Sequence, residues 1–257
     1  MKLVHAIAVA SLLLALAGCA STPDDTGIVD PDKTAAEFYR EAKRALDNGN
    51  YQTAIERLET LQARYPFGAE AKQAELDIIY AYYGAEEWDS AVSAADRFIR
   101  LNPTHERVDY ALYMRASAGM NRGTDLLGRV FKTDRALRDP QPLRQAFADF
   151  KRLVTDYPAS PYAEDARYRM LVLRNQLAKH ELAVAEYYLS RSAYVAAANR
   201  AKSVVENYQE TPAVMRALEI LAEAYGKLNL PDLQQDIVRV IALNYPDHPL
   251  AKKAAAQ

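Results

Sequence analysis

A repeated spacing of bulky, alanine and proline residues constrains the fold of this chain more than any other feature of its sequence. Five helical stretches close at Tyr65-Pro66, Asn102-Pro103, Tyr157-Pro158, Tyr208 and Tyr245-Pro246, and in the fourth of them Gln209 stands where the others have proline. Fourteen residues before these closures stand Tyr51, Trp88, Leu143, Tyr194 and Pro231. Three residues after those starts come Ala54, Ala91, Ala146, Ala197 and Gln234. Four of the five stretches therefore carry a small residue where two helices could cross closely.

This pattern is typical of the second helix of a tetratricopeptide repeat, a helix-turn-helix unit of about 34 residues. One unit cannot bury its own apolar faces, so units stack into a superhelix with a concave groove. The sequence predicts an all-α tetratricopeptide-repeat solenoid of about five repeats over residues 35–246, with a C-terminal tail at 247–257. The irregular fifth repeat fits a terminal unit that faces solvent. The alternative is an irregular helical bundle in which the prolines coincide by chance.

Two intervals between closures are longer than the others, because successive closures are 37, 55, 51 and 37 residues apart. The first excess lies at about 119–141, a partly basic stretch with glycines in which we expect a loop with a short helix around Leu126 to Phe131. The second lies at about 162–190, which contains no glycine or proline. It predicts one long helix of about 44 Å, which we expect to project beyond the groove wall.

The N-terminal segment has the layout of a secretory signal peptide over residues 1–18, with Lys2, an apolar run and small residues at its end. The apolar run is too short to span a bilayer as a helix. Its last residues and the only cysteine, Leu16-Ala17-Gly18-Cys19, resemble the bacterial lipobox, which implies acylation of Cys19. Ala20, in place of aspartate, resembles the signal for export to the outer membrane. Residues 19–34 then form the lipidated cysteine and a flexible tether; the alternative is an ordinary signal peptide with an incidental cysteine.

Composition and motifs argue against several functions. Lys and Arg total 32 against 34 Asp and Glu, which does not suggest nucleic-acid binding. His105-Glu106 and His180-Glu181 lack the second histidine of a zinc-protease helix, and phosphate-binding glycine loops are absent from the sequence. We therefore predict no enzymatic activity, no cofactor and no metal. A glycosidase needs two carboxylates on opposite sides of a cleft, and no short sequence motif identifies such a pair. A cell-wall hydrolase therefore remains an alternative.

Tyrosine is enriched, with 17 tyrosines against six phenylalanines. Its apolar ring and polar tip suit both half-buried helix packing and peptide-binding grooves. Packing explains any single tyrosine, whereas a set that faces one groove would form a peptide-binding surface.

Several stretches, which together extend along most of the chain, resemble the sequences of one protein family. They are Arg64 to Gly68, Leu76 to Tyr83, Asp96 to His105, Asp109-Tyr110 with Tyr113 to Arg115, Asp134-Arg135 with Arg138 to Gln141, and Val184 to Tyr188 with Arg191. These stretches are similar to the BamD (ComL-type) family, the tetratricopeptide lipoproteins of the outer-membrane β-barrel assembly machinery. The resemblance runs from the lipobox almost to the C-terminus and is weakest after about Thr211.

The resemblance implies a scaffold that its lipid holds at the periplasmic face of the outer membrane. Its C-terminal repeats would bind the periplasmic domains of the central barrel subunit, and accessory lipoproteins would attach around the body. By position in the family, the implied partner-binding residues are Asn199, Arg200, Tyr187, Tyr188 and Arg191. Arg200→Glu is expected to weaken this complex and leave the fold intact, because charge reversal on an exposed helix face rarely unfolds a protein.

The same resemblance implies that the N-terminal repeats receive the aromatic-ended signal of unfolded barrel proteins. The implied residues are Tyr65, Phe67, Tyr80 and Tyr83, with Arg97 as the partner of the signal's carboxylate. The alternative hypothesis is a tetratricopeptide adaptor lipoprotein for cell-wall synthesis or division, since periplasmic proteins in those processes also use repeats of this kind.

Overall fold

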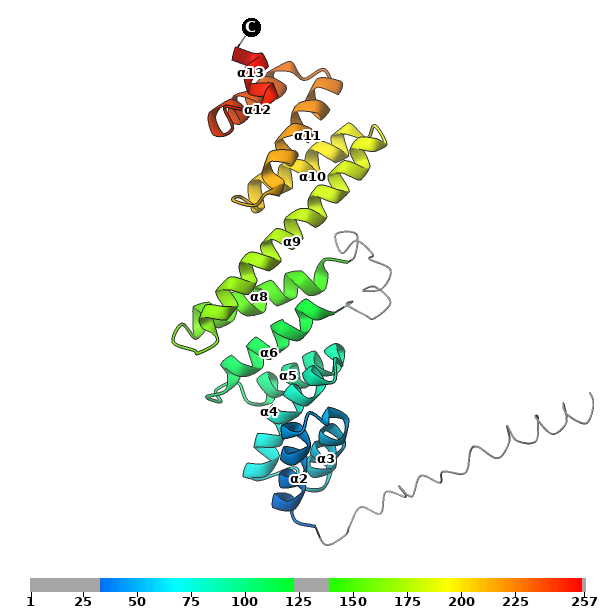
Figure 1. Cartoon of the computed structure of the whole chain (residues 1–257), viewed down its shortest axis with the longest axis vertical. Helices are drawn as coiled ribbons and strands as arrows, with labels where there is room; N and C mark the ends of the chain where they lie inside the picture. Colours follow the sequence, from blue (N-terminus) through cyan, green and yellow to red (C-terminus); the bar gives the residue numbers. More distant parts are fainter. Residues whose placement is uncertain (1–32, 123–138, 256–257) are drawn as a thin grey trace, which may run out of the picture.

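The chain forms a stack of helix pairs that rises along one axis (Figure 1). The computed structural model describes residues 33–122 and 139–255. Within those ranges the pairs are α2 (Ala35–Asp47) with α3 (Tyr51–Arg64), α4 (Ala69–Gly84) with α5 (Trp88–Leu101), α6 (Val108–Asn121) with α8 (Gln141–Asp156), α9 (Ala163–Ser190) with α10 (Tyr194–Asn207), and α11 (Ala213–Lys227) with α12 (Pro231–Asn244). A short helix, α13 (Pro249–Ala255), follows the last pair. The prediction of an all-α tetratricopeptide-repeat solenoid is confirmed.

The small residues of the repeated pattern lie where helices cross. Ala54, Ala91, Ala146 and Ala197 are at most 1% exposed. In the fifth repeat the sizes of the two facing residues are exchanged, with the large residue on the second helix and the small one on the first. Gln234 takes the alanine position, and its Nε2 donates to the carbonyl oxygen of Ala222 at 3.0 Å. Gly226 of the facing helix leaves room for it, because a Cβ at Gly226 would lie only 2.6 Å from the same Nε2 atom.

Four repeats use one turn to join their two helices. The second turn residue has a left-handed backbone in each, at Gly49 (φ 72°), Glu86 (59°), Ser192 (57°) and Asn229 (56°). The next N–H donates to the carbonyl five residues earlier, from Asn50 to Ala45 at 2.8 Å, Glu87 to Tyr82 at 2.9 Å, Ala193 to Tyr188 at 3.0 Å and Leu230 to Tyr225 at 3.0 Å. This closure satisfies a carbonyl at the end of the first helix and fixes the direction in which the second helix starts.

Opposite substitutions in this turn should have opposite effects. A left-handed conformation costs a residue with a Cβ about 1–2 kcal/mol, partly offset by the entropy that glycine loses on folding. A Cβ at Gly49 would meet nothing within 4 Å. We therefore expect Gly49→Ala to lower the free energy of unfolding by about 0.5–1 kcal/mol and Ser192→Gly to raise it by about as much. Urea denaturation measures both; effects of the same sign would contradict the backbone explanation.

The long helix α9 belongs to two parts of the core. Its first half contributes Ala163, Ala166 and Leu173 to the middle apolar cluster. Its second half contributes Ala178 and Ala185 to the C-terminal cluster, against α10 and α11. The prediction that this helix projects beyond the groove wall is wrong, because both halves are packed. As Figure 1 shows, α9 instead joins the lower and upper helix pairs.

A buried ion pair connects α5, α6 and α8 in the middle of the stack. Arg115 donates from Nε and Nη2 to the two carboxylate oxygens of Asp149, at 2.9 and 2.6 Å, and its Nη1 pairs with Asp96. Asp149 is only 3% exposed. Burial raises the pKa of Asp149, and the hydrogen bonds from Arg115 and Gln145 oppose that rise.

Several predicted features lie outside the described residues. These are the signal peptide at 1–18, Cys19, the tether as far as residue 32 and the short helix expected around Leu126 to Phe131. Within residues 33–122 and 139–255, no helix combines the length and the apolar character needed to cross a membrane.

Candidate partner-binding surfaces

Arg200 belongs to a group of three charged side chains from α8, α9 and α10. Glu181 accepts from Arg144 Nη2 on Oε1 at 2.8 Å and from Arg200 Nη1 on Oε2 at 3.0 Å. The Glu181 side chain is 5% exposed, whereas those of Arg144 and Arg200 are 44% and 46% exposed. A buried carboxylate therefore anchors two guanidinium groups that still reach solvent.

The contact with Glu181 argues against an intact fold for Arg200→Glu, because Arg200 is not a fully solvated arginine. Arg200 instead compensates a buried charge, and a glutamate there would face Glu181 with a second negative charge. Unpaired buried charge is strongly destabilising, so we now expect this variant to lose stability as well.

The C-terminal end of α9 carries a second exposed group. Tyr187 is 54% exposed, and the Arg191 guanidinium lies 5.2 Å from the centre of its ring, a cation–π distance. Tyr188 meets Tyr187 edge to face at 5.7 Å and packs on the C-terminal core. Asn199 is exposed beside Arg200.

The two groups do not share one side of α9. Six residues separate Glu181 from Tyr187, which is about 240° around a helix of 3.6 residues per turn. Arg200 approaches α9 at Glu181, so Tyr187 points away from that contact. The predicted partner-binding residues thus form two surfaces, one at the C-terminal end of α9 and one on α10, where Arg200 meets Glu181 of α9.

Two of the predicted signal-binding residues lie in the loop between α3 and α4. Tyr65 is used in packing, because its hydroxyl donates to the carbonyl oxygen of Lys33 at 2.7 Å and its ring lies 6.5 Å from that of Phe38. The Phe67 ring packs on no other aromatic ring of the described residues, and the residue is 88% exposed. Of the two, Phe67 is the one available to a partner.

Tyr80 and Tyr83 lie near the other end of α4, about 17 and 21 Å along the helix axis from its first residue, Ala69. Tyr80 packs edge to face on Tyr51 at 6.0 Å and keeps 43% of its surface exposed. The ring of Tyr83 packs on Trp88 at 5.2 Å, and its hydroxyl accepts from Asn121 Nδ2 at 3.3 Å. Tyr83 is therefore mainly a packing residue, whereas part of the Tyr80 side chain is exposed to solvent.

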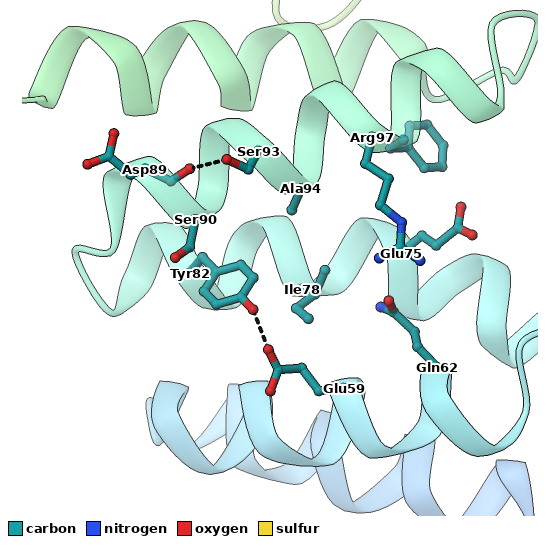
Figure 2. A pocket seen from close by; sticks show the side chains of 11 residues that line it. Glu59, Gln62, Glu75, Ile78, Tyr82, Asp89, Ser90, Ser93, Ala94 and Arg97 are labelled. Carbon is teal, nitrogen blue, oxygen red and sulfur yellow. Dashed lines mark hydrogen bonds between the residues drawn. The ribbon is translucent and has the colours of Figure 1, made fainter.

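Arg97 lines a pocket of about 430 Å³ between α3, α4 and α5 (Figure 2). Ile78, Ala94 and Phe98 supply its apolar lining. Figure 2 shows Arg97 at one end of the pocket and the Tyr82 side chain at the other. Tyr82 and Ile78 are each two residues from Tyr80 along α4, which is about 200° around the helix. Tyr80 therefore faces away from the pocket, and the five signal-binding candidates do not converge.

The carboxylates around this pocket already have partners. Glu59 accepts from the Tyr82 hydroxyl at 2.6 Å. Glu75 accepts from Asn102 Nδ2 at 2.9 Å and pairs with Lys72 at 3.5 Å. Asp89 pairs with Arg122. Arg97, by contrast, forms no ion pair with another residue in the described part of the chain, so its charge is available to a ligand.

Sequence reasoning missed Glu181 and Arg144. Glu181 was considered only as part of a failed zinc motif. The signal that could have found it is its position on the apolar stripe of α9, together with Leu177, Ala178 and Ala185. A charged residue on such a stripe needs a buried partner. In residues 33–122 and 139–255, no group of three or more metal-binding side chains is assembled.

Sequence similarity to known proteins covers most of the chain. Residues 31–240 match the YfiO family, described as "Outer membrane lipoprotein". The outer membrane protein assembly factor BamD of Vibrio cholerae serotype O1 is 46% identical over 90% of this chain and 96% of its own. BamD of Neisseria gonorrhoeae is 41% identical over 95% of this chain and 92% of its own. BamD of Pasteurella multocida is 38% identical over 81% of this chain and 80% of its own. The chain belongs to the YfiO family of outer membrane lipoproteins, together with these BamD proteins.

Proposed function

We propose that this chain is a lipid-anchored scaffold subunit of the machinery that assembles β-barrel proteins in the outer membrane. The main support is its identity of 46%, over 90% of its length, to a relative named as an outer membrane protein assembly factor. A solenoid suits this function because it presents separate surfaces on one frame. It acts by binding, and it raises the effective concentration of a substrate near a second partner. Acylation of Cys19 would hold it at the periplasmic face.

The C-terminal repeats, in this proposal, bind the periplasmic domains of the central barrel subunit. Arg200, beside Asn199, offers a half-exposed guanidinium to an acidic group of that subunit. Tyr187 and Arg191, backed by Tyr188, offer a separate exposed aromatic and cationic contact. Because these contacts face different sides of α9, they suit one partner that wraps around it or two partners, such as the barrel subunit and an accessory lipoprotein.

The N-terminal repeats, in this proposal, bind the aromatic-ended signal of an unfolded barrel protein. The charge of Arg97 is available for a terminal carboxylate, and Ile78 and the partly exposed Ala94 line the same pocket to contact an aromatic ring. Phe67 and Tyr80 would contact more distant parts of an unfolded chain. Tyr65 and Tyr83 would support these surfaces by packing.

The test of the scaffold function is affinity purification of the tagged lipoprotein from detergent-solubilised outer membranes, followed by mass spectrometry. We expect a barrel protein with tandem periplasmic domains, together with small lipoproteins. Recovery of cell-wall synthesis or division enzymes without that barrel protein would replace the proposal with the adaptor function. Release of muropeptides from purified sacculi would instead indicate a hydrolase.

Arg97→Gln is expected to weaken binding of a peptide that ends in phenylalanine with a free carboxylate by at least about tenfold, because hydrogen bonds to charged groups contribute about 1.5–3 kcal/mol. Fluorescence anisotropy with the full mature chain measures this. Arg100→Gln is the matched control, since Arg100 is exposed on the same helix and does not line the pocket. Amidation of the peptide should weaken wild-type binding equally; a peptide that binds Arg97→Gln as well as wild type would exclude this site.

A further inference from the structure

The bond between Glu181 and Arg200 fixes a side chain that would otherwise be free to move. Arginine has large rotamer entropy, and ordering such a side chain on binding costs affinity. The bond joins Arg200 Nη1 to Glu181 Oε2 at 3.0 Å, and it uses one of the five N–H donors of the guanidinium. With 46% of the side chain exposed, other donors remain available to a partner. Glu181 thus holds Arg200 in place, while other N–H donors of the guanidinium remain free to bind a partner.

Arg144 fixes Glu181 in turn. It bonds the other carboxylate oxygen, Oε1, at 2.8 Å. The carboxylate is therefore held from α8 and α10 at once, so it cannot turn away from Arg200 without losing a charged hydrogen bond inside a buried site. Two guanidinium groups on one carboxylate leave a net charge of +1. That charge, at the surface, favours an acidic side chain in the partner.

We propose that Glu181, itself held by Arg144, is a positioning residue that presents Arg200 to a carboxylate of the central barrel subunit. The inference rests on the proposed function, and it adds a role for two residues that the family resemblance did not indicate. Glu181 touches the partner only through Arg200. A Glu181 that competed with the partner's carboxylate for Arg200 would have the opposite effect, because its removal would tighten binding.

Glu181→Gln is expected to weaken binding of the full-length lipoprotein to the purified full-length barrel subunit in detergent by about threefold to tenfold, the range for one side chain that must be ordered on binding. Arg144→Gln should weaken it in the same direction, by about twofold to threefold. Asp149→Asn is the matched control, because it removes a similarly buried, arginine-paired carboxylate in α8 without contact to Arg200. It should leave the affinity within twofold of wild type.

A double-mutant cycle separates positioning from general support of the fold. If Glu181 acts through Arg200, Glu181→Gln should cause no further loss in an Arg200→Gln background. An equal loss in both backgrounds would overturn the inference, as would unchanged or tighter binding by Glu181→Gln. If Arg200→Gln itself binds like wild type, the assignment of Arg200 in the proposed function fails first. Should Glu181→Gln not fold, Arg144→Gln carries the same test, and wild-type affinity of that variant would overturn the inference.

Discussion

Arg115→Met is expected to lower the free energy of unfolding by about 3–5 kcal/mol, the cost of removing one partner of a buried ion pair. Asp149 would keep its charge at 3% exposure without the two hydrogen bonds that Arg115 donates. Asp96, the other partner, is 46% exposed at its side chain, so water can solvate it. Most of the loss therefore comes from Asp149.

This loss should depend on pH. The pKa of Asp149 is already raised above its ordinary value of 3.8, and Arg115 opposes that rise, so removing Arg115 raises the pKa further. A raised pKa means that the folded state binds the proton more tightly than the unfolded state, so protonation favours folding. The deficit of Arg115→Met should be complete well above this pKa and should shrink as the pH falls through it toward 3.8.

Urea denaturation at several pH values measures both effects. Arg152→Met is the matched control, because Arg152 forms an exposed pair with Asp156 in which both side chains are 48% exposed. Such pairs contribute about 0–1 kcal/mol. If Arg115→Met costs no more than this control, or if its deficit grows at low pH, the buried pair does not stabilise the protein as described.

Cys19→Ala is expected to move the protein from the membrane fraction to the soluble periplasmic fraction. One acyl chain binds membranes only marginally, while two or more anchor a protein stably. Cys19 is the only cysteine of the chain, so its replacement removes every thiol that could carry the lipid.

The comparison needs a leader whose cleavage does not depend on Cys19. Residues 1–18 are therefore replaced with an ordinary cleavable secretory signal in the variant, and its size is checked to confirm cleavage. The unaltered chain, fractionated in parallel, should stay with the outer membrane. A cleaved Cys19→Ala protein that membranes still retain after a urea wash, which dissociates binding to a membrane partner, would contradict the lipid anchor.

Local signals were sufficient to predict the repeats. The alanine at the helix crossing, the bulky residue at the start of the second helix and the closing proline all act within one unit, and the stack reuses them. Even the irregular fifth repeat keeps its second helix, at Pro231–Asn244. The position of α9 was predicted less well, because length and composition indicate a helix but do not determine which neighbours its two halves contact.

The sequence by itself therefore determined the all-α repeat fold, the family and the type of residue available for binding, since these depend on short-range spacing and on identity along the chain. Only the tertiary structure decided which charges meet. Arg115 and Asp149 are 34 residues apart, and Glu181 lies 37 residues from Arg144 and 19 from Arg200. Such contacts depend on how each helix is rotated against its neighbours. The same rotation turns Ile78 and Tyr82 of α4 toward the pocket that Arg97 of α5 lines, and it leaves Tyr80 on the opposite side of α4. Side chains two residues apart on a helix point about 200° from each other.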